Sequence, residues 1–216
     1  MPSATLQEYL EVIYKLALEG VVRPAQLADA LAVSAPTVTS TLRRLEGAGL
    51  VTRPGLGVEL TETGRLEALA IIRRHRVAER FLVDALGLPW EAVHEEACLL
   101  EHALSERVLE ALETFLDNPD VCPHGHPIPS AALDVAPTDG LPLSAMPAGS
   151  RVIVVSVPEE DDQVLAYFGE IAMRPGVEVL VEQTGPFAGP LLVVVGDRHV
   201  AVDRAVAARI LVRPGR

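Results

Sequence analysis

The chain has 216 residues, and 49% of them are apolar, so it can bury two or three small hydrophobic cores. Its net charge of -12 excludes a general polyanion binder, because affinity for nucleic acid comes mainly from basic residues that neutralise phosphates. The acidity is uneven: the block Glu159-Glu160-Asp161-Asp162 lies far from the arginine-bearing N-terminal region.

Two further classes of protein are excluded by the residue pattern. The sequence contains no stretch of about 18 or more uninterrupted apolar residues that could cross a bilayer, and no charged start followed by an apolar run that would indicate export. We therefore expect a cytoplasmic protein. Its two cysteines, Cys98 and Cys122, are too few for a disulfide framework and are expected to be core residues or metal ligands.

Residues 1–63 predict a winged helix-turn-helix domain. Apolar residues at helical spacing between positions 4 and 19 predict a helix that Gly20 ends. Pro24 and Pro36 each fit the first turn of a further helix, with "AVS" as the turn between them. The segment "LVTRPGLGVELTETG" alternates as two short strands around a Pro-Gly turn, which predicts the wing. In such domains the third helix enters the major groove of DNA.

The exposed face of this third predicted helix carries small hydroxyl groups and arginine rather than acids. Such side chains contact phosphates and base edges, which favours double-stranded operator DNA as the partner. The alternative is a winged helix that makes only protein contacts. The candidate DNA-binding residues are Gln26, Ser34, Pro36, Thr37, Thr39, Ser40, Arg43 and Arg53.

The rest of the chain divides by composition. Residues 64–117 are predicted to be helical with a break at "GLPWE", and they form a dimerisation domain, since twofold DNA readers need two recognition helices about one helical turn apart. The stretch 119–150 holds seven of the 17 prolines and is typical of a linker. Four short β-rich runs from residue 151 onward predict a small β-barrel. The fold is therefore expected to be mainly α with a small β domain.

The segment "VHEEACLLEH", residues 93–102, places metal-binding side chains on a leucine-bearing helix. At about 100° per residue, one narrow arc contains His94, Cys98, Glu101 and His102. Imidazole, thiolate and carboxylate groups coordinate first-row divalent metals, and i, i+3 and i+4 spacing lets neighbours reach one ion. The alternative is a buried histidine and cysteine satisfied by the backbone, with glutamates on the surface.

Three other segments also carry histidine, cysteine or glutamate side chains that could bind a metal ion. Helical pairs of this kind are individually more typical of a solvated face, and a loop cysteine near histidines is more often unliganded. Their recurrence beside the arc favours metal binding over coincidence. The helical pairs are His75 with Glu79 and Glu8 with Glu11, and the Pro-flanked loop "CPHGHPIP" contains Cys122 and His124.

These motifs resemble a known family. With "EYLEVIY", "SAPTVT", "RRHRVAERFL", "VHEEACLLEH" and "PHGHPIP", the chain resembles the diphtheria-toxin-repressor family of metal-dependent transcriptional repressors over essentially its full length. The resemblance implies a homodimer that binds operator DNA and is not an enzyme. It also implies four segments: a winged helix at 1–63, a helical metal-binding and dimerisation domain at 64–120, a linker at 121–150 and an SH3-like domain at 151–216.

The resemblance further implies two metal sites per chain. The primary site would use Glu8, with Glu11 beside it, together with Cys98, Glu101 and His102. In one version the second site uses His75, Glu79 and His94, completed by Glu160 and Gln163 of the C-terminal domain. In the version of a manganese-responsive branch it uses Glu79 with Cys122 and His124. Both versions of the second site are open.

Departures from the family pattern bear on the metal. Iron-type members carry methionine at the Glu8 position and cysteine at the Cys98 position, while short manganese-type members carry carboxylates at both. A hard carboxylate at Glu8 favours Mn(II), with Fe(II) as the second choice. Cys98 opposes this preference unless its backbone carbonyl is the ligand. Ser40 stands where iron-type repressors have a glutamine that reaches the DNA, so a different operator preference is expected.

The expected function is a Mn(II)- or Fe(II)-responsive repressor of metal-homeostasis genes. One rival is a winged-helix regulator of an organic ligand, whose DNA binding would be indifferent to chelators. A second rival is a metallohydrolase with Glu101 as base, which needs an open coordination position in a substrate cleft. The sequence has no HExxH motif to support that enzyme.

Overall fold

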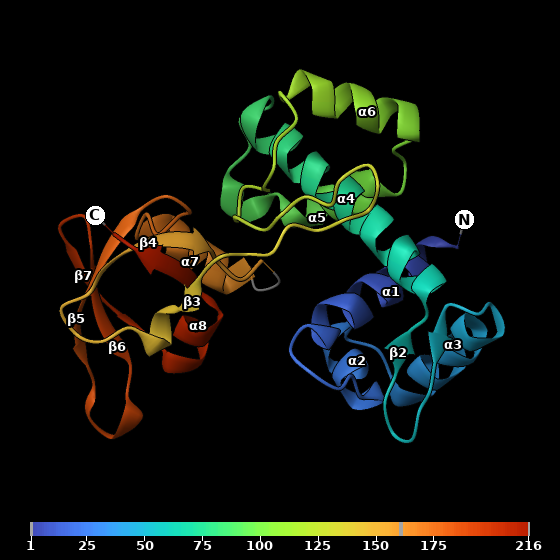
Figure 1. The fold of residues 1–216 in the computed structure, drawn as a ribbon, viewed down its shortest axis with the longest axis horizontal. Helices are drawn as coiled ribbons and strands as arrows, with labels where there is room; N and C mark the ends of the chain where they lie inside the picture. Colours follow the sequence, from blue (N-terminus) through green and yellow to red (C-terminus); the bar gives the residue numbers. More distant parts are fainter. Residues whose placement is uncertain (1, 160–161, 216) are drawn as a thin grey trace. The chain divides into compact units, whose positions relative to one another are not determined.

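The computed structural model describes residues 2–159 and 162–215, and the chain forms two compact units (Figure 1). One unit contains residues 1–74 and 129–134, and the other contains residues 75–128 and 135–216. The long helix α4, Glu62–Asp84, contributes residues to both units. Among the described residues, no helix combines the length and the apolar character that crossing a bilayer requires.

The N-terminal unit contains three complete helices and a two-stranded wing, as the sequence predicts, together with the start of α4. Prolines occupy the first turn of the second and third helices, where a missing N–H costs nothing. The wing pairs Val51 with Leu60 in antiparallel register. Leu10, Ile13 and Leu42 are fully buried in the shared core. The elements are α1 Ala4–Ala17, α2 Pro24–Ala30, α3 Ala35–Gly47, β1 Val51–Thr52 and β2 Glu59–Leu60.

The helical segment has one more interruption than the sequence predicts. The expected break at "GLPWE" is present, and the short helix η1, Trp90–Ala92, follows it. A second break separates α5, His94–Glu101, from α6, Glu106–Phe115. Ser105 starts α6, because its hydroxyl oxygen accepts a hydrogen bond from the Val108 amide at 3.4 Å. His102 is therefore the C-cap of α5 rather than part of a continuous helix.

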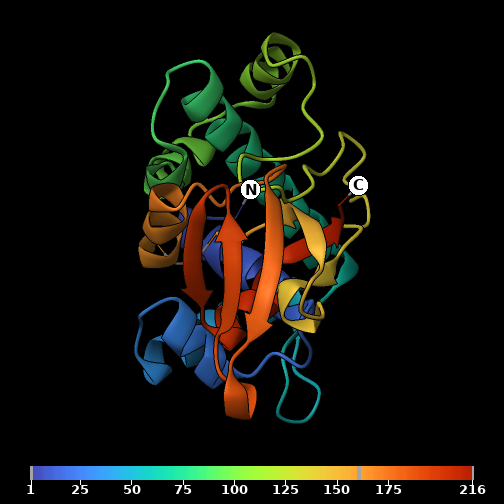
Figure 2. The same cartoon turned by 90° about the vertical axis from the view of Figure 1, so that its left-hand side faces the viewer.

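The C-terminal part of the chain forms a six-stranded antiparallel sheet in the order β3-β8-β4-β5-β6-β7, seen face on in Figure 2. Each of the four predicted β-rich runs contains one strand. Strand β3 arises from within the segment predicted as linker. The strands are β3 Leu141–Pro142, β4 Arg151–Ser156, β5 Glu178–Thr184, β6 Leu191–Val195, β7 Arg198–Val202 and β8 Leu211–Pro214.

Two helices and two short turns accompany this sheet. Phe168 of α7 and Ile210, which follows α8, are buried in its core, and Trp90 of η1 joins the same cluster. The guanidinium of Arg174 lies over the Trp90 ring at 5.1 Å, as in a cation–π contact. The elements are η2 Leu143–Ala145, α7 Asp162–Glu170, η3 Pro186–Ala188 and α8 Arg204–Arg209.

The "CPHGHPIP" segment is a packed turn rather than an open linker. An isolated bridge pairs Val121 with Pro127, and the Cys122 amide donates to the His126 carbonyl at 2.9 Å. The Val157 amide donates to the His124 carbonyl at 3.0 Å, which ties the turn to the end of β4. Within the turn, Gly125 has a φ of +88°, and a Cβ there would lie 2.0 Å from the Val155 carbonyl oxygen. Only glycine fits.

Gly125→Ala should therefore destabilise the second unit. The added methyl group meets backbone rather than a flexible side chain, and overpacking of this kind costs roughly 1–3 kcal/mol. The matched control is Gly47→Ala at the end of α3, where a Cβ meets no atom within 4 Å and helix propensity favours alanine. Thermal unfolding of both variants checks this, and a Gly125→Ala midpoint at or above wild type would contradict the packed turn.

Candidate metal centres and DNA-binding face

A buried ion-paired chain joins α4 to α5. His75 Nδ1 lies 2.7 Å from Glu101 Oε2, and His75 Nε2 lies 3.2 Å from Glu79 Oε1. All three side chains are at most 1% exposed. Burial alone would lower the pKa of His75, but the Glu79 charge and the hydrogen bonds around the ring raise it well above 6.5. Both ring nitrogens can donate to a carboxylate only when the ring is an imidazolium.

The carboxylate of Glu79 is the hub of this region. Its Oε1 also lies 3.3 Å from His124 Nδ1 and 3.9 Å from His94 Nδ1. Burial raises the pKa of Glu79, but the charge of His75 and the hydrogen bonds of the histidines lower it well below 4.5. Its Oε2 is buried without a hydrogen-bond partner among the residues that the structure describes. A buried ionised oxygen with no donor is what a bound cation would satisfy.

Four buried residues bring their donor atoms together at this hub. One ligand atom from each lies within 4.8 Å of the others. His124 Nε2 lies 2.9 Å from the Trp90 carbonyl oxygen, to which it can donate only as N–H. In the neutral tautomer this leaves the Nδ1 lone pair facing the cluster, the arrangement common in metal-binding histidines. The residues, which we call the second cluster, are Glu79, Cys122, His124 and Glu159.

The thiol of Cys122 is protonated in this environment. Burial raises its pKa well above 9.0, and the neighbouring charges of Glu79 and Glu159 raise it further. The Cys122 Sγ lies 3.9 Å from Glu159 Oε2, to which it donates. A divalent ion must therefore displace this proton before sulfur can bind it, so loading of the second cluster releases protons.

Glu159 is the functional candidate that sequence reasoning missed. Arg76 holds its carboxylate, with the guanidinium 3.4 Å from Glu159 Oε1 and a second nitrogen donating to the Pro127 carbonyl at 2.6 Å. The sequence places Glu160 and Gln163 here instead. Glu160 lies outside the described residues, and Gln163 is exposed on α7. The acidic block shows no periodicity that would single out Glu159.

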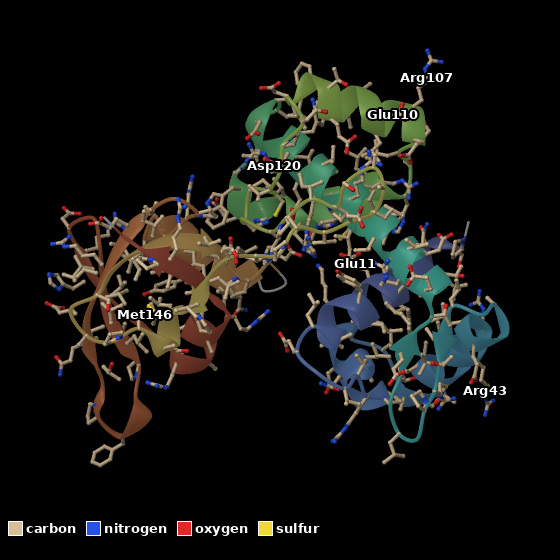
Figure 3. All side chains as sticks on the ribbon, in the orientation of Figure 1. Glu11, Arg43, Arg107, Glu110, Asp120 and Met146 are labelled. Carbon is tan, nitrogen blue, oxygen red and sulfur yellow. The ribbon has the colours of Figure 1, made fainter. Side chains whose placement is uncertain are left out.

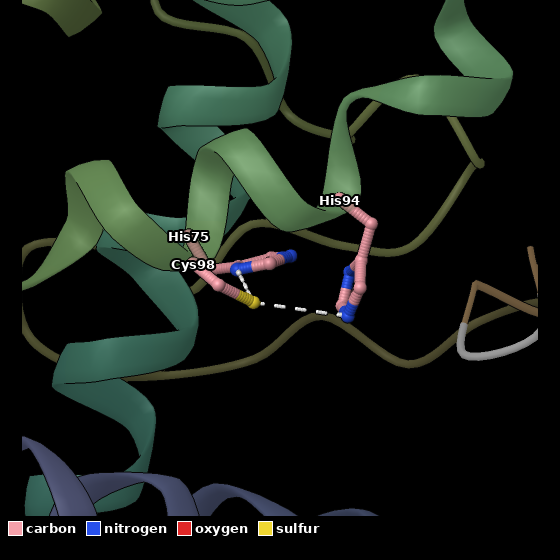
Figure 4. Close-up of side chains that lie close together, drawn as sticks. All are labelled: His75, His94 and Cys98. Atoms are coloured by element: carbon pink, nitrogen blue, oxygen red, sulfur yellow. Dashed lines mark hydrogen bonds between the residues drawn. The ribbon is translucent and has the colours of Figure 1, made fainter.

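A separate group of donor atoms, which belongs to His75, His94 and Cys98 and not to the second cluster, lies on α4 and α5 (Figure 4). The Cys98 sulfur is 3.9 Å from His75 Nδ1 and 3.8 Å from His94 Nε2, and the two imidazole rings are 4.9 Å apart. Burial raises the pKa of the Cys98 thiol, but hydrogen bonds from the two histidines outweigh this and lower it below 9.0. His94 and Cys98 are half-buried, so solvent reaches both.

The remaining predicted ligands divide between the two units. In the second unit, His102 Nε2 lies 3.4 Å from Glu101 Oε1, and both residues follow Cys98 at the end of α5. Glu8 and Glu11 lie on α1 in the first unit. Glu8 is exposed, whereas Glu11 is buried and forms an ion pair with Lys15 at 3.1 Å.

The candidate DNA-binding residues lie on the exposed side of α3 and at its borders. Val38, Leu42 and Leu45 face the core, which leaves Ser40 and Arg43 outside, and Figure 3 labels the projecting Arg43. Five other candidates are exposed, and Thr39 is half-buried. Gln26 accepts a hydrogen bond from the Arg23 amide at 2.8 Å and thereby caps α2. The exposed five are Gln26, Ser34, Pro36, Thr37 and, in the wing turn, Arg53.

Three of the hydroxyl groups on α3 have local hydrogen-bond partners. The Ser34 hydroxyl caps the helix by accepting from the Thr37 amide at 3.3 Å. Thr39 donates to the Ala35 carbonyl at 3.0 Å, and Ser40 donates to the Thr37 carbonyl at 2.9 Å. Because both donate inward, their oxygens remain acceptors on the helix surface, where cytosine amino groups and adenine amino groups can donate to them.

His94 should remain protonated at neutral pH in the metal-free protein. Burial lowers its pKa, but Cys98 and Glu79 raise it to about 10, while the charge of His75 opposes the rise. A raised pKa contributes stability that is complete below 6.5 and is lost as the pH rises through about 10. The lowered pKa of Cys98 has the opposite sign, so an NMR titration assigned with His94→Gln is the suitable measurement. A midpoint near 6.5 would contradict the pairing.

Models of known protein families match most of the chain. The family described as iron dependent repressor, N-terminal DNA binding domain, matches residues 1–55. The family described as iron dependent repressor, metal binding and dimerisation domain, matches residues 61–130, and the FeoA domain matches residues 141–214. The chain therefore contains a DNA-binding domain and a dimerisation domain.

Individual proteins of known function are similar to this chain over most of its length. The iron-dependent repressor IdeR of Mycobacterium tuberculosis is 40% identical over 222 residues, with 96% of each chain covered. The diphtheria toxin repressor of Corynebacterium efficiens is 38% identical over 187 residues, with 81% of each covered. A solved manganese-dependent transcriptional repressor in complex with manganese is 36% identical, with a TM-score of 0.89 over 97% of this chain and 100% of that one. The chain belongs to the family of iron- and manganese-dependent transcriptional repressors that includes the diphtheria toxin repressor.

Proposed function

We propose that the chain represses metal-homeostasis genes in the cytoplasm by binding operator DNA as a homodimer when Mn(II), or less favourably Fe(II), is bound. This proposal rests mainly on the second cluster, whose four residues, Glu79, Cys122, His124 and Glu159, are all buried. The Glu79 Oε2 atom in this cluster has no hydrogen-bond partner among the described residues. Within a DNA-binding repressor, such a site indicates that the protein binds divalent cations.

The proposed ligands form two sets, one for each ion. The sensory ion is assigned to Cys98, Glu101 and His102 of α5, with Glu8 of α1 as the further carboxylate and Glu11 positioned beside it. The second ion is assigned to Glu79, Cys122, His124 and Glu159. This choice follows the manganese-branch version of the second site and adds Glu159. In the other version His75, Glu79 and His94 would bind, with Gln163 and Glu160.

The preference for manganese rests on the oxygen donors. Two carboxylates belong to the second cluster, and two more, Glu8 and Glu101, belong to the proposed sensory set. Mn(II) favours oxygen ligands, whereas the thiols of Cys98 and Cys122 favour softer ions. The relatives include both iron-dependent repressors and a manganese-dependent one, so the donor chemistry of this chain supports the choice.

Metal occupancy is coupled to DNA binding through differential affinity. An ion that binds more tightly to the DNA-competent arrangement of the protein shifts the population toward it, and DNA in turn tightens ion binding. The His75 imidazolium pairs with both Glu79 and Glu101. These carboxylates must exchange an imidazolium partner for the ion, which lowers the apparent affinity and makes loading dependent on pH.

The surface of α5 and α6 supports the proposed homodimer. Leu99 is 75% exposed and Phe115 is 68% exposed, and Val108 is also exposed on α6. Exposed large apolar side chains on neighbouring helices mark surfaces that another protein covers. The proposed division of the chain keeps the winged helix at 1–63, the metal-binding and dimerisation domain at 64–120, the linker at 121–150 and the SH3-like domain at 151–216.

Binding of operator DNA should require Mn(II) or Fe(II). In an electrophoretic shift assay with promoter DNA, we expect a shift with either ion that EDTA reverses, and loss of the metal response in the Glu8→Ala, His102→Ala double variant. Arg43→Ala should weaken the shift without changing metal binding, because the exposed Arg43 supplies a phosphate or base contact. Arg213→Ala, an exposed arginine of β8, is the matched control. A shift indifferent to metal and chelator would overturn the proposal.

The two versions of the second site predict different stoichiometries. If Glu159 is a ligand, Glu159→Gln should lose one bound Mn(II) per chain, or bind it at least about tenfold more weakly, as removal of metal-site groups does. Gln163→Ala should bind as many ions as wild type, since the Gln163 side chain is exposed. Equilibrium dialysis with metal analysis measures both. The reverse result would assign the second site to the His75, Glu79 and His94 version.

A further inference from the structure

We propose that Leu56, at the tip of the wing, enters the minor groove of operator DNA and selects A·T base pairs beside the sequence that α3 reads. The Leu56 side chain is 89% exposed, and it belongs to the turn between β1 and β2. It is not among the candidate DNA-binding residues named above. The inference rests on the proposed binding of operator DNA, but not on the metal dependence of that binding.

The turn that carries Leu56 is held by its own backbone. The Gly57 amide donates to the Pro54 carbonyl at 3.0 Å, which closes the turn. The Val58 amide donates to the Val22 carbonyl at 2.9 Å, which ties the wing to the loop between α1 and α2. In both views of the molecule the turn extends beyond the helices of its unit (Figures 1 and 2). A side chain on such a preorganised turn loses little conformational freedom when it binds.

The surface next to Leu56 is also apolar and exposed. Val21 is 74% exposed, and its Cγ1 lies 3.2 Å from where a Cβ on Gly57 would be, so it borders the turn. Pro54 is exposed as well. Apolar side chains with this exposure add little to folding stability, which comes from burial. Neighbouring exposed apolar residues mark a surface that a ligand covers, and the matching family model identifies this unit as DNA-binding.

The wing lies where the minor groove of bound DNA would be. Strand β1 starts at Val51, shortly after α3 ends at Gly47, so the wing is next to the recognition helix. A helix fits the major groove, which is about 12 Å wide, whereas the minor groove is about 6 Å wide and admits single side chains. An element beside α3 therefore meets the bordering phosphates and then the minor groove. The exposed Arg53 can neutralise such a phosphate, and Leu56 can enter the groove.

A leucine side chain discriminates between base pairs in this groove. A G·C pair presents the 2-amino donor of guanine there, whereas an A·T pair presents only acceptors at its edges. Leucine cannot accept a hydrogen bond, so an amino group that it covers would lose water without gaining a partner. The narrow minor groove of A·T tracts also encloses a side chain more closely. Leu56 should therefore favour A·T pairs at the positions that it covers.

Base analogues test this selection without changing the edge that α3 reads. Inosine in place of guanine removes the 2-amino group, and 2,6-diaminopurine in place of adenine adds one, while the major-groove edges stay the same. The probe is a promoter fragment whose protected region has been footprinted with the full-length protein. Diaminopurine at the edges of that region should weaken wild-type binding roughly tenfold, as a mismatched position does, and inosine there should strengthen it.

The Leu56 variants decide whether this side chain causes the response. Leu56→Ala should respond to neither analogue, and Leu56→Met, which keeps an apolar side chain of similar size, should respond as wild type does. Equal responses of Leu56→Ala and wild type would overturn the proposal.

Affinity and salt dependence separate an apolar contact from a phosphate contact. Leu56→Ala should bind unmodified DNA roughly tenfold more weakly with an unchanged salt dependence, because leucine neutralises no phosphate. Arg53→Ala should instead reduce the salt slope by about one. The matched control is Leu141→Ala in β3, which removes a 57% exposed leucine of the C-terminal sheet and should bind as wild type.

Two results would overturn the assignment of Leu56 to DNA. One is an affinity of Leu56→Ala equal to that of Leu141→Ala. The other is a changed elution volume in size-exclusion chromatography with unchanged DNA affinity, which would assign Leu56 to a contact between copies of the chain. A wild-type shift that EDTA leaves intact would contradict only the proposed metal response, and the Leu56 comparison would still be made under that condition. The two proposals therefore fail separately.

Discussion

The buried carboxylate of Glu79 is the constraint on which the metal-binding unit depends. It is fully buried on α4, and an ionised carboxylate in that position is unstable unless positive charge or hydrogen bonds surround it. His75, His94 and His124 all direct a ring nitrogen toward its Oε1. Because these histidines come from α4, α5 and the turn after α6, one charge determines how three segments are arranged.

The same network adds polar contacts to the apolar packing of Trp90 between the helical segment and the C-terminal sheet. Arg76 donates to the Pro127 carbonyl and to Glu159, and the His126 Nε2 lies 2.8 Å from the Val157 carbonyl oxygen. Well-packed apolar residues in such positions are often as stable as buried ion pairs, or more stable. The polar network is therefore better explained by ligand binding than by stability. It places Glu159 beside residues from distant parts of the chain and keeps their charges balanced.

Local patterns made much of the fold predictable. The helices α1 to α3 and four strands of the sheet follow from periodicity, prolines in first turns and a Pro-Gly turn, all of which act over a few residues. The second helical break was missed because Ser105, which caps α6, follows a stretch with helical periodicity. For the site, sequence neighbours such as Glu101 and His102, which lie 3.4 Å apart, were predictable as a pair. Glu159 was not, because only the folding of β4 against the turn that contains His124 brings it to Glu79.

The two proposed metal sites are linked electrostatically through His75, which contacts a carboxylate of each. The His75 imidazolium lies between Glu79 and Glu101, so one positive charge pairs with carboxylates that belong to two different sets. An ion bound at either set would add its own charge beside one of these carboxylates and would therefore change the electrostatic environment of the other. Two ions would thus influence each other through His75 even where they share no ligand, because a buried carboxylate requires a positive charge beside it whichever ion supplies it.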